Sequence, residues 1–268
     1  MKKYLSILLT VLLVVTLSGC TNKDKDGDAD LDHLARIKRD GYITIATEGV
    51  WEPWTYHDAS GALVGFDVEV AQAIAKKLGV EARFMETDWD AILIGVSTGK
   101  FDIACNGVGY TEERAKSFNF TDPYVYTDVV LIVRGDNTDI HSFEDLKGKK
   151  TANSIGSTYA GLAEKYGANV QNVDTLDQTI QLLIDNRIDA TINSLDSFDA
   201  YTSEKPDVDI KIVQQVPGDS VVIPIRNDED SISLREAINT ALKELRDSGE
   251  LAQLSIKYFG SDKTIAKD

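Results

Sequence analysis

An uninterrupted apolar run, Val129-Val130-Leu131-Ile132-Val133, lies near the middle of the chain, and a second, Val221-Val222-Ile223-Pro224-Ile225, lies further along it. Short apolar runs of this kind are typical of buried strands. Between them, residues 131–221 alternate strand and helix patterns, which predicts a self-contained α/β lobe. We expect the two runs to be strands that cross from this lobe into another.

The flanking segments, residues 34–130 and 222–268, show the same alternation and together predict a second, discontinuous lobe. Apolar residues recur at helical spacing over 67–78, and capping-box spacing at Thr87 and Ser233 predicts two further helix starts. The predicted class is therefore α/β, with mixed sheets and flanking helices. Two lobes joined by two crossing strands can hinge.

Composition excludes several classes of function. The 44 Asp and Glu outnumber the 28 Lys and Arg, for a net charge of −16, which argues against nucleic-acid binding because phosphate contacts need basic patches. The two Cys and three His exclude a disulfide framework or a zinc-ribbon array. We interpret His33, His57 and His141 as surface residues and Cys105 as a small packing residue. No cofactor or metal is expected.

The N-terminus has the pattern of a secretory signal: Met1-Lys2-Lys3, an apolar run over 5–17, and then Leu17-Ser18-Gly19-Cys20. A transmembrane anchor is the alternative, but the run is short for a membrane span. The ending resembles the bacterial lipobox, which implies cleavage after residue 19 and lipid (palmitate) attachment to Cys20. Residues 20–33 predict a lipid-anchored linker.

Two loops between a strand and a helix are candidate binding sites. The turn Asn106-Gly107-Val108-Gly109 lets a ligand approach the backbone, and Arg114 follows it with a guanidinium suited to a carboxylate. The alternative is a plain glycine turn with a surface arginine. Ser157 and Thr158 open a predicted helix, whose N–H groups would bind an anion; a simple N-cap is the alternative.

The tryptophans Trp51, Trp54 and Trp89 all lie in strand-to-helix loops or at a helix start. Loop aromatics often form the walls of ligand pockets. For Trp54, core packing remains the alternative.

Several motifs follow one another along the chain: Gly65-Phe66-Asp67-Val68-Glu69-Val70-Ala71, Thr111-Glu112-Glu113-Arg114, Phe120-Thr121-Asp122-Pro123-Tyr124, residues 142–148 (SFEDLKG), Arg187-Ile188-Asp189-Ala190 and Lys257-Tyr258-Phe259-Gly260. Together they resemble the polar amino-acid family of solute-binding proteins, family 3. The resemblance implies a two-lobe type II periplasmic-binding-protein fold. It also implies a non-enzymatic, extracytoplasmic receptor of an amino-acid ABC importer, which docks on permease subunits. The loops around Trp51, Trp89 and Gly107 resemble the cystine-binding branch.

The resemblance also implies roles for individual residues. Arg114 and the Gly109 N–H would hold the ligand α-carboxylate, helped by Thr158 at its helix start. The Gly107 carbonyl would accept a hydrogen bond from the α-ammonium. Trp51 and Trp89 would sandwich the ligand side chain, and Glu48 would reach it.

One position departs from the family pattern, because Ser194 stands where an Asp usually binds the α-ammonium. Either Asp196 or Glu48 compensates, or the ligand has no free α-amino group. The branch also usually has Gln at the position of Gly107. The ligand is therefore left open between cystine, a different amino acid and an N-modified amino acid.

Two other functions remain as alternatives. Fold-related dehydratases use cleft carboxylates, and Glu48 would be the candidate acid. A surface sensor or adhesin would bind a ligand without transport. A protein that must hinge and dock is expected to be a monomer, held at the extracytoplasmic face of the cell membrane by its lipid.

Overall fold

The computed structural model describes residues 31–266, except for the side chain of Asp219. The predicted signal peptide, Cys20 and the linker up to residue 30 lie outside the described residues. The chain divides into the units Met1–Leu31 and Asp32–Asp268, and every contact below lies within the second unit. Among the described residues, no helix combines the length and apolar character needed to cross a membrane.

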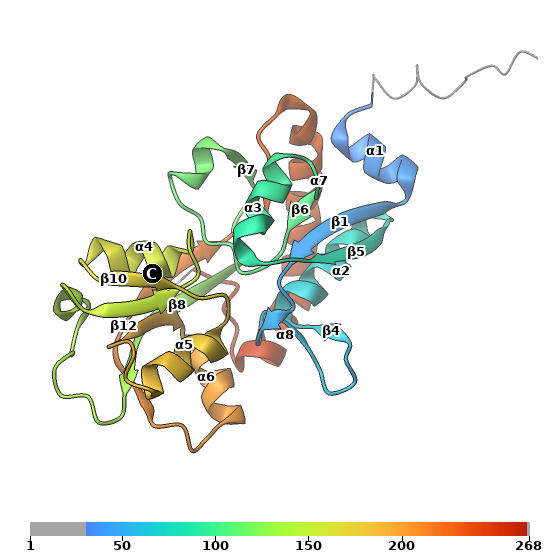
Figure 1. Cartoon of the computed structure of the whole chain (residues 1–268). Coiled ribbons are helices and arrows are strands. Elements are labelled where there is room, and N and C mark those ends of the chain that lie inside the picture. Colours follow the sequence, from blue (N-terminus) through green and yellow to red (C-terminus); the bar gives the residue numbers. More distant parts are fainter. Residues whose placement is uncertain (1–30, 267–268) are drawn as a thin grey trace, which may run out of the picture. The chain divides into compact units, whose positions relative to one another are not determined.

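The first lobe is built on a five-stranded mixed sheet (Figure 1). Its strands, in sheet order, are β5 (Glu81–Glu86), β1 (Tyr42–Thr47), β6 (Ile103–Ala104), β13 (Pro224–Arg226) and β7 (Phe118–Phe120). Strand β1 runs parallel to β5 and β6, whereas β13 is antiparallel to β6 and β7. The remaining elements of this lobe are β2 (Val50–Trp51), β3 (Thr55–His57), β4 (Leu63–Val64), α1 (His33–Asp40), α2 (Phe66–Leu78), α3 (Trp89–Ser97), η1 (Arg114–Lys116), η3 (Glu229–Ser231), α7 (Ile232–Asp247) and α8 (Glu250–Phe259).

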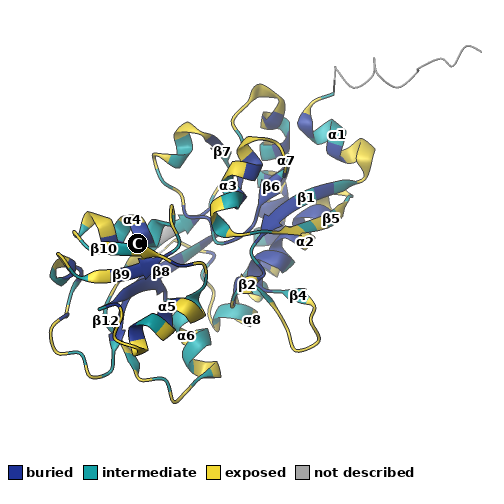
Figure 2. Ribbon diagram, viewed as in Figure 1, coloured by how far each residue is buried: buried dark blue, intermediate teal, exposed yellow. Residues whose placement is uncertain are grey.

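The two faces of this sheet support separate apolar cores. Successive side chains of a strand point to opposite faces, so Ile45 and Ala46 belong to different clusters. Ile45 packs with apolar residues of α2, α7 and α8, whereas Ala46 packs with those of α3. Figure 2 shows the sheet buried between these layers.

The second lobe contains an antiparallel sheet in the order β11 (Thr191–Ser194), β8 (Val125–Arg134) and β12 (Ile210–Val221). A parallel pair, β9 (Lys150–Asn153) and β10 (Asn169–Asn172), adjoins it through a bridge between Thr151 and Ala190. Its other elements are η2 (Phe143–Leu146), α4 (Thr158–Lys165), α5 (Leu176–Ile184) and α6 (Leu195–Glu204).

Strands β8 and β12 connect the two lobes side by side. Val125 pairs with Val221, and both pack in the core of the first lobe. Further along β8, Val129 and Leu131 pack in a core of the second lobe. The predicted two-lobe α/β fold is thus confirmed. Because both strands contribute to both cores, the limits predicted at 130/131 and 221/222 stay a prediction.

Two predicted helix starts were wrong. Helix α7 begins at Ile232 after Ser231, so Ser233 lies inside the helix and does not cap it. The preceding turn η3, capped by the Asp228 side chain, moves this start upstream. Helix α3 begins at Trp89 after Asp88, so Thr87 does not cap it. A capping box does form at the start of η2, between Ser142 and Asp145.

The interpretation of His33 as a surface residue was also wrong. Helix α1 begins at His33, the last residue of the predicted linker, and this histidine is only 4% exposed. Its Nδ1 lies 2.9 Å from Ser231 Oγ and its Nε2 lies 2.8 Å from Asp102 Oδ1. Partners distant in sequence therefore bury a histidine that has no local apolar pattern.

Candidate functional site

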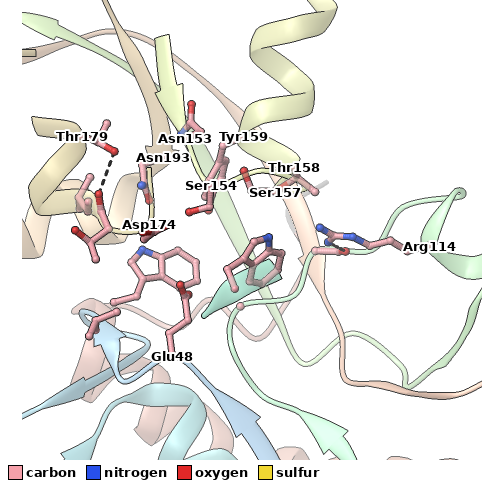
Figure 3. Close-up of a pocket in the computed structure, with 17 residues that line it drawn as sticks. Glu48, Arg114, Asn153, Ser154, Ser157, Thr158, Tyr159, Asp174, Thr179 and Asn193 are labelled. Atoms are coloured by element: carbon pink, nitrogen blue, oxygen red, sulfur yellow. Dashed lines mark hydrogen bonds between the residues drawn. The ribbon is translucent and has the colours of Figure 1, made fainter. Parts of the chain in front are cut away.

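A cavity is lined by residues of both lobes (Figure 3). The first lobe contributes Glu48, Val50, Trp51, Trp89, Gly107, Gly109 and Arg114. The second lobe contributes Asn153, Ser154, Ser157, Thr158, Tyr159, Asp174, Thr175, Leu176, Thr179 and Asn193. Most of these residues follow the carboxyl ends of strands, where open α/β sheets bind their ligands.

Arg114 joins the two lobes at one end of the cavity. Its Nη1 donates to the Gly109 carbonyl at 2.8 Å, and its Nη2 donates to the Gly156 carbonyl of the second lobe, also at 2.8 Å. The guanidinium carbon lies 5.4 Å from the centre of the Trp89 ring. Figure 3 shows Ser157 and Thr158 on the same side of the cavity as Arg114. A fixed guanidinium beside a helix start is suited to an anionic group.

Glu48 and Asp174 lie toward the other side of the cavity (Figure 3). Burial, with smaller contributions from the charges of Asp88 and Asp174, raises the pKa of Glu48 to about 7 against the opposing hydrogen bond from Asn106. This carboxyl is therefore close to half ionised at neutral pH. The cavity carries positive charge at one end and carboxyl groups at the other.

Asn106 does not line the cavity but positions Glu48 from behind. It is fully buried, and its Oδ1 accepts from the Glu48 backbone N–H at 2.8 Å and from the hydroxyls of Thr47 and Thr55. Its Nδ2 donates to Glu48 Oε2 at 2.5 Å. These bonds fix the orientation of the amide, so Asn106 holds the loop after β1 against the loop after β6.

Asp67 positions Gly107, the residue after Asn106 in the loop that follows β6. The sequence did not indicate this role. Its carboxyl accepts from the Gly107 N–H at 2.5 Å and from the Tyr124 hydroxyl at 2.7 Å. Complete burial raises the pKa of Asp67 to about 6 in spite of both bonds.

The tryptophans divide between the cavity and the core. Trp51 and Trp89 line the cavity, whereas Trp54 is fully buried. For Trp54, the alternative of core packing is therefore the correct one. Trp51 stacks on Trp54 with ring centres 5.4 Å apart and meets Tyr159 of the second lobe edge-on at 6.4 Å. A Cβ at Gly107 would lie 2.5 Å from the Trp51 ring, and Gly107 has φ +57°. Only glycine leaves room for this wall.

Ser194 and Asp196 do not line the cavity. Ser194 is fully buried as the N-cap of α6, and its hydroxyl accepts from the Ser197 N–H at 3.1 Å. Asp196 forms a buried ion pair with Lys263, which follows α8. The expectation that Asp196 replaces the missing family aspartate has no geometric support, because an ammonium of the chain itself is bound there. Cys105 is buried as expected.

Most of the second-lobe lining was not predicted, including Asn153, Asp174 and Asn193. These residues could have been found by the rule already applied to the first lobe, that ligands bind beyond the carboxyl ends of strands. Asn153 ends β9, Asn193 lies near the end of β11, and Asp174 lies between β10 and α5.

Residues 43–261 match the model of the bacterial extracellular solute-binding proteins, family 3. The chain belongs to this family. It is 36% identical to the L-cystine-binding protein TcyA of Bacillus subtilis (strain 168) over 267 residues, 98% of this chain and 99% of that protein. Solved relatives include an ancestral arginine-binding protein bound to arginine (36% identity, 82% of this chain and 99% of that one, TM-score 0.76). The L-cystine solute receptor of Neisseria gonorrhoeae, unliganded and open, matches with 36% identity over 86% of this chain and 98% of that one, at a TM-score of 0.57.

The two TM-scores differ although the sequence identities are equal. This chain superposes better on the arginine-bound ancestral protein than on the open cystine receptor. Two contacts between the lobes, Trp51 with Tyr159 and Arg114 with the Gly156 carbonyl, agree with lobes drawn together around the cavity. Closure of this kind is a hinge motion in which a ligand can favour the closed form only by touching both lobes there.

Proposed function

We propose that this receptor binds cystine, or a related polar amino acid, between its closing lobes and delivers it to the permease of an ABC importer. The observation that carries the proposal is the polarity of the cavity. Arg114 and the helix start at Thr158 lie on one side, Glu48 and Asp174 lie on the other, and aromatic rings form the walls. A zwitterion needs this division between donors and acceptors.

The proposed roles combine the lining of the cavity with the roles that the family resemblance implies. Arg114, the Gly109 N–H, Ser157 and Thr158 hold the α-carboxylate, and the Gly107 carbonyl accepts from the α-ammonium. Trp51 and Trp89 sandwich the side chain, and Glu48 accepts from its polar end. Asn106 keeps Glu48 and Gly107 in place.

We also propose the cellular setting that the first residues suggest. Residues 1–19 act as a signal peptide, Cys20 carries the lipid, and the following linker holds a monomeric binding domain at the outer face of the cell membrane. A ligand released there passes to permease subunits.

A receptor is favoured over a cleft dehydratase. The relative TcyA, which matches nearly the whole chain, is a binding protein. Glu48 has the raised pKa of a general acid, but its nearest polar partner is the amide of Asn106, which cannot exchange protons in catalysis. Turnover of a cyclic acid by the purified protein would reverse this choice.

Thermal unfolding, followed by calorimetry against a panel of amino acids, tests the proposal after bound ligand has been removed by unfolding and refolding. A ligand at 100 times its dissociation constant adds about 2.7 kcal/mol of stability, which gives a clear rise in Tm. A rise with cystine supports the proposed ligand. A rise with a different amino acid keeps the receptor and replaces cystine, and no rise with any amino acid contradicts the proposal.

Affinity is expected to rise about tenfold between pH 6 and pH 8 for a ligand whose cationic group contacts Glu48. Burial places the pKa of free Glu48 at about 7. A bound cation favours the carboxylate, so binding releases a proton below this pKa and becomes stronger as the pH rises through it. Isothermal titration calorimetry across this range measures the slope. Glu48→Gln should remove it; a slope unchanged in that variant would exclude Glu48 as its source.

A further inference from the structure

Asn153 presents a buried hydrogen-bond acceptor that no described residue of the chain satisfies. It ends β9 and is only 5% exposed. Its Nδ2 donates to the Ile192 carbonyl at 2.7 Å, which fixes the orientation of the amide. Its Oδ1 is buried and has no hydrogen-bond partner among the described residues, although the side chain lines the cavity (Figure 3). Buried amide oxygens are almost always paired, so this one calls for a donor from outside the chain.

The surroundings of Asn153 indicate which donor is suitable. Asn193 also lines the cavity, but its Oδ1 already accepts from the Ser194 N–H at 2.8 Å. Asp174 adds a carboxylate from the same lobe, and its charge is close enough to Glu48 to raise the pKa of that residue. Arg114, on the other side, is the one cationic side chain among the described residues that line the cavity. A group that meets an amide oxygen and a carboxylate there must donate hydrogen bonds and gains from positive charge.

We propose that Asn153 and Asp174 form a subsite for a ligand ammonium group on the wall of the second lobe, replacing the acceptor that Ser194 does not supply. The inference rests on the proposed amino-acid receptor and specifies its ligand: the molecule bears a free, charged nitrogen group. Ser194, buried as a helix cap, and Asp196, paired with Lys263, both lie outside the lining of the cavity. An ammonium held from the second lobe, with a carboxylate held by Arg114, ties the ligand to both lobes and thereby favours closure.

The test is calorimetric titration of Asn153→Ala and Asp174→Asn with L-cystine and L-arginine. Each variant is expected to bind at least tenfold more weakly than the unmodified protein. Asn169→Ala and Asp177→Asn are the matched controls, because both residues are exposed, belong to the second lobe and lie outside the cavity. The controls are expected to bind within twofold of the unmodified protein. Asp174 is exposed, so Asp174→Asn keeps the test decisive even if Asn153→Ala fails to fold.

Ligands in which one nitrogen group is blocked or neutral show whether the subsite binds the α-ammonium or a side-chain cation. If Asn153 meets the α-ammonium, N-acetylation of the ligand weakens binding to the unmodified protein much more than to Asn153→Ala. If it meets a side-chain cation, replacement of arginine by citrulline shows that pattern instead. Coupling of this kind is what a double-mutant cycle measures.

The remaining outcomes separate the subsite from the receptor. If Asn153→Ala and Asp174→Asn bind as tightly as the unmodified protein, while Arg114→Ala does not bind, the subsite is wrong and the receptor stands. If the unmodified protein binds no amino acid, the proposed function fails and the subsite fails with it.

Discussion

Replacing Lys263 by alanine is expected to lower the free energy of unfolding by about 3–5 kcal/mol, because it would leave Asp196 as an uncompensated buried charge. The side chains of Lys263 and Asp196 are only 11% and 3% exposed. Burial raises the pKa of Asp196 even with Lys263 beside it. The backbone around Lys263 is held independently, since its N–H donates to Ser255 Oγ and its carbonyl accepts from the Tyr126 N–H. Chemical denaturation at neutral pH measures the loss.

Lys243→Ala is the matched control, because Lys243 pairs with Asp247 on the exposed face of α7, with side chains 73% and 61% exposed. Exposed pairs contribute about 0–1 kcal/mol, so this variant should differ little from the unmodified protein. The double variant Lys263→Met, Asp196→Leu should recover much of the stability by removing both charges. A loss below about 1 kcal/mol for Lys263→Ala would contradict the importance assigned to this buried pair.

Replacing Arg114 by alanine is expected to weaken amino-acid binding by tenfold or more. A hydrogen bond to a charged group contributes about 1.5–3 kcal/mol, and a tenfold change in affinity corresponds to about 1.4 kcal/mol. Arg114 also bonds to carbonyl groups of both lobes, so its loss removes a contact that accompanies closure. Titration calorimetry with the ligand identified by thermal unfolding measures the change.

Lys116→Ala provides the control for Arg114, because it removes the same charge from the same short helix η1. The Lys116 side chain is 70% exposed and pairs with Glu113, outside the cavity. The Lys116→Ala variant should bind the amino acid with the affinity of the unmodified protein. Equal binding by Arg114→Ala would exclude the carboxylate role.

The parts of the fold and cavity that depend on local patterns were predictable. Apolar runs identified β8 and the passage from β12 to β13, because buried strands require continuous apolar residues. The rule that ligands bind beyond the carboxyl ends of strands brought Glu48, Trp51 and Arg114 to one place. These residues follow strands β1 and β6, which are neighbours in the sheet.

The remaining features depend on contacts between residues far apart in the chain. His33 is buried by Asp102 and Ser231, and Asp196 is bound by Lys263; neither pairing leaves a local pattern. Asn153 enters the cavity only because the second lobe faces the first there. Sequence spacing gives the position of a side chain on its own element but not the partner that a neighbouring lobe presents.

The placement of the tryptophans has an optical consequence. All three belong to the first lobe: Trp51 and Trp89 line the cavity, Trp54 lies in the core, and residues 131–221 contain none. Intrinsic fluorescence therefore reports from one side of the cavity, with Trp54 as a background that solvent cannot quench. Since Tyr159 of the second lobe contacts Trp51, the emission of Trp51 should respond when the lobes separate. The protein thus carries its own probe of occupancy, without any attached dye.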